Sequence, residues 1–281
     1  MISDTKVVAI GGGTGLSTML KGLKLHTHNI TAVVTVADDG GSSGILRSDL
    51  GMLAPGDVRN CVSALAEVDP VMGELLNFRF KDGSLKGHSL GNLFLAALNE
   101  TSSSFDEAVK KFSHLTGVVG TVYPVTNESV TLSALLEDGR LIEGESHIGV
   151  HHDGPKNGIV KLMVNPEKPK AVDGVIKALE KADIIVLGPG SLYTSIIPNL
   201  LVDGVVDAIK KSNAVKIYVC NIMSQAGETE NYTVSDHLAA IERHSYEGIA
   251  DIVIANNAII PESLRIKYAS EHAREVMIDS I

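Results

Sequence analysis

The chain has 281 residues, 44% of them hydrophobic, which is enough for one large α/β domain with its own core. Its 24 Lys and Arg against 34 Asp and Glu give a formal net charge of −10, and aromatic residues make up only 4%. This composition argues against a nucleic-acid or anionic-membrane surface, which needs clustered basic or aromatic side chains. We find no apolar run near the roughly 20 residues of a membrane span and no signal peptide, so we expect a cytoplasmic protein.

The first 44 residues predict two strands, a helix between them and a glycine-rich loop after each strand. The elements are, in order, the strand 6–10, the loop Gly11–Gly15, the helix 16–23, the strand 30–37 and the loop Asp38–Gly44. Short apolar runs indicate the strands, and apolar residues at helical spacing indicate the helix. This order is the βαβ arrangement of a parallel sheet.

The middle of the chain changes from a helical to an antiparallel pattern. Helical spacing predicts helices joined by polar turns, at 57–68, 71–80, 89–99 and 105–115. Apolar and polar residues then alternate, and Asp138-Gly139 between two alternating runs is a strong hairpin signal. We therefore expect an inserted antiparallel β segment at about 118–164.

The βα rhythm returns after this segment. The predicted elements are helices at 172–181, 200–211, 235–244 and 262–272, and strands at 183–187, 216–221, 251–255 and 275–278. No internal repeat or low-complexity linker divides the chain. The predicted fold is a single α/β domain over 1–281, with a doubly wound, mostly parallel, Rossmann-like sheet and an inserted antiparallel β segment.

Glycine-rich loops follow the predicted strands. They are Gly11–Gly15, Gly40–Gly44, Gly188–Gly190 and Asn221–Gly227. The carboxyl ends of parallel strands meet at one edge of the sheet, where ligands bind at the switch point of the strand order. N–H groups at a helix start form an anion cradle there, which predicts phosphate binding by Gly12, Gly13, Thr14 and Gly15. The loop is neither a complete G-x-G-x-x-G nor a Walker A motif, so a tight turn without a ligand is the alternative.

Asp38 and Asp39 lie where an acidic side chain contacts the ribose in a dinucleotide site. One ribose needs a single carboxylate, so a Mg²⁺ ion or a general base is a second role open to them, and a solvated acidic turn is a third. Ser42 and Ser43 follow in a loop that we expect to be too glycine-rich for a helix. Their hydroxyls suit phosphate or sugar oxygens, or a helix cap.

Two predicted helix starts carry further polar residues. Arg59 and Asn60 fall in a first turn, where the helix dipole disfavours a cation, so Arg59 indicates an anionic partner. His88 and Asn92 stand at another helix start, where a histidine is as often structural as functional.

The later loops add further ligand-binding candidates. Those after the strand 183–187 are Gly188, Gly190, Ser191, Tyr193 and Thr194, with Asn199 facing the same crevice. The amides of Asn221 and Gln225 could read the edge of a base. Tyr268, on the last predicted helix, either reaches the nucleotide or lies on the surface.

Six sequence blocks carry a resemblance to a known family. They are GGGTG at 11–15, TVADDGGSSGILR at 35–47, APGDVRNC at 54–61, GHSLGN at 87–92, GPGSLYTSIIPNLL at 188–201 and NIMSQAGETENYT at 221–233. Over nearly its whole length the chain resembles the YvcK-type proteins, the gluconeogenesis-factor branch of the phospholactate-transferase-like (CofD) superfamily. The resemblance implies a Rossmann-like fold that binds UDP-sugars such as UDP-N-acetylglucosamine. It also implies a homodimer, and a role in cell shape and envelope synthesis during gluconeogenic growth.

We therefore expect a UDP-sugar-binding regulatory protein without a tightly bound cofactor. The alternative is a CofD-like transferase that moves a phospholactyl-type group from a nucleotide diphosphate donor. It would use Mg²⁺ at Asp38 and Asp39, with Arg59 or His88 on the transferring group. The match to the true transferases is confined to the first glycine loop and this acidic pair. A nicotinamide dehydrogenase is disfavoured, because we recognise neither a substrate domain nor an acid–base pair for hydride transfer.

Overall fold

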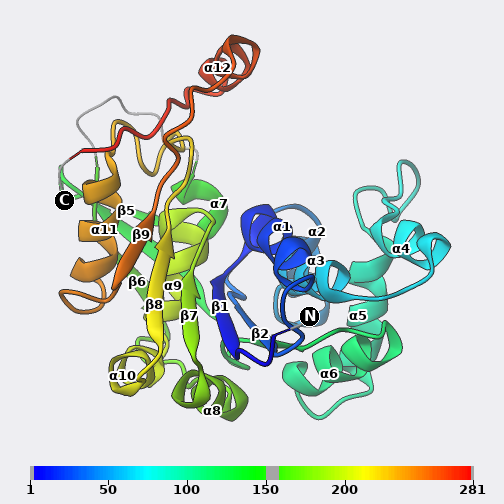
Figure 1. Cartoon of the computed structure of the whole chain (residues 1–281). Helices are drawn as coiled ribbons and strands as arrows, with labels where there is room; N and C mark the ends of the chain where they lie inside the picture. Colours follow the sequence, from blue (N-terminus) through cyan, green and yellow to red (C-terminus); the bar gives the residue numbers. More distant parts are fainter. Residues whose placement is uncertain (1–2, 150–157, 280–281) are drawn as a thin grey trace.

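The structure, a computed structural model, describes residues 3–149 and 158–279, and within them the main sheet has six parallel strands (Figure 1). They are β1 (Val7–Gly11), β2 (Ile30–Val34), β3 (Thr121–Pro124), β7 (Ile184–Leu187), β8 (Val215–Val219) and β9 (Ile252–Ile254). Their spatial order is β3-β2-β1-β7-β8-β9. The chain winds outwards from β1 to β3, returns to β7 beside β1, and winds outwards again. The predicted doubly wound α/β fold is confirmed, and the switch point lies between β1 and β7.

A smaller antiparallel sheet lies beside the main one. Its strands in the described residues are β4 (Thr131–Leu136), β5 (Leu141–Glu143) and β6 (Ile159–Asn165), in the order β5-β4-β6. The predicted Asp138-Gly139 hairpin is confirmed, because β4 pairs with β5 in antiparallel register and Gly139 has a φ of +87°.

The predicted start of this insertion, at 118, is wrong. β3 pairs in parallel with β2 and so belongs to the main sheet. As an edge strand it buries alternate residues, Val122 and Pro124, and this pattern is the same as that of a half-buried antiparallel strand. Residues 150–157 of the predicted insertion lie outside the described residues.

Helices cover both faces of the main sheet. They are α1 (Gly13–Leu23), α2 (Gly41–Leu50), α3 (Gly56–Leu65), α4 (Pro70–Asn77), α5 (Leu90–Glu100), α6 (Phe105–Leu115), α7 (Glu145–Ile148), α8 (Asp173–Lys181), the π-helical η1 (Leu192–Ile196), α9 (Ile197–Leu200), α10 (Val205–Lys211), α11 (Val234–Arg243) and α12 (Glu262–Ala269). Figure 1 shows α3 to α6 gathered beside β1 and β2, and α12 standing out from the body of the molecule. Across the described ranges, no helix combines the length and the apolar character that a membrane span requires.

The expectation that Ser42 and Ser43 lie in a loop is wrong, because both are in the first turn of α2. The N–H of Gly44 donates to the carbonyl of Gly40 at 2.9 Å, as in a helix. A Cβ at position 44 would lie 2.0 Å from the carbonyl oxygen of Asp39. The glycine is therefore required by a close main-chain approach and does not indicate an irregular loop.

Two later elements also differ from the prediction. The predicted helix 200–211 is divided, since α9 ends at Leu200 and α10 begins after Gly204, which has a φ of +86°. The predicted strand 275–278 is not a regular strand. Glu275 and Met277 each form only an isolated bridge to the loop after β8.

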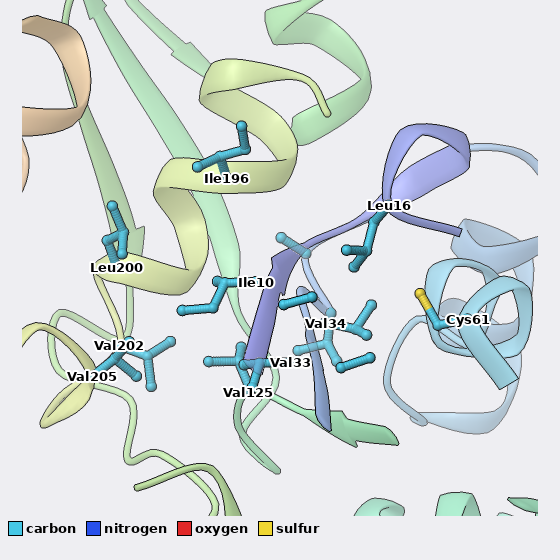
Figure 2. Close-up of a cluster of buried hydrophobic side chains, with 14 of the residues drawn as sticks. Ile10, Leu16, Val33, Val34, Cys61, Val125, Ile196, Leu200, Val202 and Val205 are labelled. Carbon is cyan, nitrogen blue, oxygen red and sulfur yellow. The ribbon is translucent and has the colours of Figure 1, made fainter. Parts of the chain in front are cut away.

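The core lies between the sheet and these helices. Figure 2 shows Ile10 of β1 with Leu16 and Cys61, from α1 and α3, on one side and Ile196 and Leu200, from η1 and α9, on the other. All five side chains are buried. This packing fixes β1 from both faces and so fixes the loop at its carboxyl end.

Candidate functional site

A cleft of about 660 Å³ opens at the carboxyl edge of the sheet, at the switch point between β1 and β7. Small-molecule sites commonly measure about 300–1,000 Å³. The loops after β1, β7 and β8 and the end of α12 form its walls. The lining includes Gly12, Gly13, Thr14, Gly15, Pro189, Gly190, Ser191, Ser195, Asn221, Ile222, Met223, Gln225, Ala226, Tyr268, Glu271 and Ala273. Three of the four predicted glycine loops therefore meet at this cleft, while the loop Gly40–Gly44 is not part of the described lining.

The loops after β1 and β7 touch main chain to main chain. A Cβ at Gly15 would lie 2.7 Å from the carbonyl oxygen of Pro189, and one at Gly12 would lie 2.6 Å from Oδ2 of Asp57. Gly15 is therefore required by a close main-chain approach, whereas a side chain at position 12 would displace the side chain of Asp57. The first turn of α1 has N–H groups without intrahelical partners, and it lies on the cleft. This end of the cleft is suited to an anion.

Side-chain amides shape the opposite wall. Asn221 Oδ1 accepts the N–H of Gly190 at 3.3 Å, and its Nδ2 donates to the carbonyl of Gly190 at 2.9 Å. Gln225 Nε2 donates to Ser191 Oγ at 2.7 Å. The sequence allowed Tyr268 either a ligand contact or a surface position, and in the structure it lines the cleft. Asn221 therefore holds the loop after β7, and Gln225 and Tyr268 face the cleft beside it.

Three predicted residues support the cleft without lining its described part. Asn199 is fully buried and its Nδ2 donates to the carbonyl of Gly11 at 3.1 Å. The hydroxyl of Tyr193 donates to the main chain of β6 at 3.1 Å, and Thr194 Oγ1 donates to Glu228 Oε1 at 3.3 Å. These bonds connect η1 and α9 to β1, β6 and the loop after β8. Gly188, with a φ of +80°, begins the loop after β7.

A second group of predicted residues forms a buried polar network beside the cleft. Ser42 Oγ lies 2.9 Å from His88 Nδ1 and accepts from Asn92 Nδ2 at 3.1 Å. Arg59 Nε donates to Asn92 Oδ1 at 3.3 Å, and its Nη1 donates to Asn77 Oδ1 at 2.7 Å. The first turns of α2, α3 and α5 are thereby joined. Asn77 was not predicted, because nothing in the sequence distinguishes it from an ordinary helix-terminal residue.

The remaining candidates lie close to this network. Ser43 is buried, and a Cβ at Gly56 would lie 2.6 Å from its hydroxyl oxygen. Asn60 is half-buried on α3 and belongs neither to the described lining of the cleft nor to the network.

Known proteins resemble this chain over nearly its whole length. The family described as 2-phospho-L-lactate transferase CofD matches residues 7–281. The chain belongs to the CofD family. A Bacillus subtilis member named gluconeogenesis factor is 46% identical over 277 residues, which are 98% of this chain and 86% of that protein. A Clostridium acetobutylicum relative is 51% identical over 279 residues, and the chain spans only 62% of that relative's length.

A solved structure supports the same relationship. The crystal structure of a UPF0052-family protein from Bacillus halodurans has a TM-score of 0.95 to this chain at 46% identity, covering 99% of this chain and 89% of that one. The chain is thus a CofD-family protein of the gluconeogenesis-factor group, and the family predicted from its sequence blocks is confirmed.

The CofD family is named after a transferase, so the acidic residues of this chain are candidates for a catalytic role. In this member Asp39 holds α7, accepting the N–H of Glu145 at 2.9 Å and the N–H of Ser146 at 2.8 Å, each with a different oxygen. Burial alone would raise the pKa of Asp39. The hydrogen bonds from Ser146 and Glu145 and the charge of Arg47 outweigh burial, so the pKa lies below its ordinary value.

Two other carboxyl groups, those of Asp57 and Glu145, have raised pKa values. Burial, followed by the charge of Asp38, raises the pKa of Asp57 to about 6, although it accepts a hydrogen bond from the N–H of Gly13. Burial, with the charges of Asp38 and Asp39 next, raises the pKa of Glu145 to about 8. Several carboxyl groups are therefore held close together at the edge of this CofD-family site.

The carboxylates of Asp38 and Asp39 already accept hydrogen bonds within the fold. Mg²⁺ needs octahedral oxygen ligands, whereas both oxygens of Asp39 are engaged by α7 and Asp38 Oδ1 accepts the N–H of Gly40 at 2.9 Å. Among residues 3–149 and 158–279, no group of three or more His, Cys, Asp or Glu is placed to hold a metal ion. Mg²⁺ at Asp38 and Asp39 stays an untested prediction, and we assign no step to it.

Proposed function

We propose that the chain binds a UDP-sugar, such as UDP-N-acetylglucosamine, in the cleft between β1 and β7, as a regulatory ligand. The observation that carries the proposal is the main-chain contact of the two glycine loops, where a Cβ at Gly15 would be 2.7 Å from Pro189. It places the first turn of α1 against Gly190 and Ser191 on a single cleft. The first turn of α1, at the switch point and against the loop after β7, is suited to the diphosphate part of such a ligand.

The rest of the cleft supports the nucleoside and sugar parts of such a ligand. Tyr268 offers an aromatic surface, and Gln225, Ser191 and Glu271 offer polar groups along the wall. The cleft volume of about 660 Å³ is suited to a ligand of this class. The net charge of −10 does not oppose the binding of a diphosphate, because neutral main-chain N–H groups hold it.

The relatives supply the biological part of the proposal. The Bacillus subtilis relative is named gluconeogenesis factor. We propose that a cytoplasmic homodimer of this chain senses the supply of UDP-sugars, and is needed for cell shape and envelope synthesis when cells grow on gluconeogenic carbon sources.

Thermal unfolding in the presence of nucleotides tests the proposal. UDP-N-acetylglucosamine at about 100 times its Kd should add about 2.7 kcal/mol to the free energy of unfolding. For a chain of this length, that gain should raise Tm by roughly 5–10 °C. GDP and NAD serve as comparison ligands. A shift of this size with NAD and none with UDP-sugars would reject the proposal.

A transferase is the second candidate. It is favoured by the match to the CofD family and by Asp57, whose carboxylate lies against Gly12 and accepts the N–H of Gly13, and whose pKa is raised to about 6. Incubation of the UDP-sugar and Mg²⁺ with acceptor alcohols, with release of UDP as the readout, separates the two candidates. Steady release that is lost in Asp57→Asn would make the chain an enzyme. Tight binding without release supports the regulatory function.

A further inference from the structure

We propose that a second copy of this chain docks on α12 and on the groove beside it, and that this contact holds one wall of the nucleotide cleft. The surface on which the second copy docks does not depend on the ligand. The link between this surface and the cleft rests on the proposed nucleotide site.

α12 is a short helix that the rest of the described chain does not cover. None of its eight residues is buried, and no side chain caps its N-terminus. Figure 1 shows it standing out from the body of the molecule. Ile266 on the helix is 66% exposed, and Ile259, just before it, is 92% exposed. Isolated helices shorter than about 12–15 residues are marginal in water, so α12 needs a further surface to pack against.

A groove of about 660 Å³ runs beside this helix. Its lining includes Glu262, Arg265 and Ile266 of α12, and Arg274, Glu275 and Met277 of the segment after it. All of these residues are exposed except Glu275, which is half-buried. Within the described ranges, no ion pair or side-chain hydrogen bond engages any of the four charged groups. Exposed apolar side chains beside polar ones mark a site of protein interaction.

The charges of the groove favour a second copy as the partner. Two glutamates and two arginines give its described lining a formal charge of zero, whereas the whole chain has a net charge of −10. A nucleic acid or an anionic membrane needs an excess of Lys and Arg. A surface with both signs in equal number is complementary to itself, because a two-fold contact can set each acidic group against a basic group of the other copy.

The groove shares a wall with the nucleotide cleft. Met223 and Ala273 line both, and Tyr268 and Glu271, at the end of α12 and just after it, line the cleft. A second copy that holds α12 therefore holds this wall, and a nucleotide bound in the cleft holds α12 for the second copy. Dimerisation and nucleotide binding should strengthen each other by the same factor.

Analytical ultracentrifugation of charge-reversed variants of the full chain tests the interface. Glu262→Arg with Glu275→Arg makes the four charged groups all basic, and Arg265→Glu with Arg274→Glu makes them all acidic. The wild type should dimerise. Each variant alone should dimerise at least about tenfold more weakly, because like charges then face each other. An equimolar mixture of the two variants should dimerise about as tightly as the wild type, since opposite charges face each other again.

A matched control makes the same change of charge elsewhere. Glu167→Arg with Glu180→Arg, at exposed positions outside the described lining of the groove, should dimerise as the wild type does. Recovery in the mixture also shows that both groove variants are folded. The interface is rejected if the wild type stays monomeric, if either groove variant dimerises as tightly as the wild type, or if the mixture does not recover.

UDP-N-acetylglucosamine added to the wild type tests the link to the cleft. Titration calorimetry measures its binding, and a saturating concentration should lower the Kd of the dimer about fivefold or more. If the ligand binds and this Kd does not change, the link is rejected and the proposed function stands. If the chain dimerises through α12 but binds no uridine nucleotide, the proposed function is rejected and the interface stands.

Discussion

Asp57 is expected to make the protein less stable at neutral pH. Burial, and then the charge of Asp38, raises its pKa from 3.8 to about 6 in the folded state. The difference of about 2 pKa units corresponds to about 3 kcal/mol, at 1.36 kcal/mol per unit. Because the folded-state pKa is the higher one, the favourable contribution is complete below pH 3.8. It is lost as pH rises through about 6.

The substitution Asp57→Asn removes this titration. The amide oxygen of asparagine can still accept the hydrogen bond from the N–H of Gly13. At a pH of about 7.5 the variant should be more stable than the wild type by up to about 3 kcal/mol, which is roughly 5–10 °C in Tm. At a pH of about 4 the difference should largely vanish.

Urea unfolding of the wild type and variant across this pH range measures the effect. Asp82→Asn, at an exposed loop position, is the matched control and should leave the difference near zero at every pH. The reasoning that burial and Asp38 raise the pKa of Asp57 would be refuted by either of two results. The Asp57→Asn variant could be less stable than the wild type at pH 7.5, or the difference in their free energies of unfolding could be the same at every pH.

Three further predictions concern the loops and the second sheet. Gly15→Ala should weaken UDP-sugar binding more than tenfold in titration calorimetry, because its Cβ would meet Pro189, whereas Gly22→Ala on the same helix, with open space around it, should bind normally. Asp39→Ala should speed hydrogen exchange of α7 and cost about 1–2 kcal/mol in urea unfolding, because two N–H groups of its first turn lose their acceptor. Burial lowers the pKa of His244, whose Nε2 accepts the N–H of Leu162 in β6 at 2.8 Å. The neutral imidazole therefore contributes stability above about pH 6.5, and this contribution is lost as pH falls. His244→Gln should make the melting temperature less sensitive to acid.

The sequence was sufficient to predict a doubly wound, parallel main sheet, but not its strand order, the place of β3 in it or the extent of the insertion. Glycine loops after apolar runs and the Asp138-Gly139 turn are local signals, and both correspond to observed features. Thr121–Pro124 could not be assigned to the right sheet, because an edge strand in a parallel sheet and an antiparallel strand bury alternate residues alike. The glycines around Ser42 and Ser43 predicted a loop in place of α2. Gly44 is needed for its close approach to the main chain of Asp39, and the sequence does not show this contact.

The candidate site was predictable where its chemistry is local. Gly12–Gly15 form a helix start directly after a strand, and this order is visible in the sequence. The sequence did not show which side-chain amides are bonded within the fold, because their partners are distant in the chain. Asn221 is engaged by Gly190, 31 residues away, and Asn199 by Gly11, 188 residues away. Only the folded chain shows that Gln225 keeps an acceptor oxygen without a partner in the described residues.

Hydrogen exchange with and without UDP-N-acetylglucosamine gives the most direct test of the site. If main-chain amides of the switch-point loops hold the diphosphate, the ligand should slow exchange in residues 12–16 and 189–192, and in 222–226 beside them. Exchange around Arg59 and His88, in the neighbouring network, should change much less. Slower exchange confined to that network, with none in the loops after β1 and β7, would contradict a diphosphate site at the switch point.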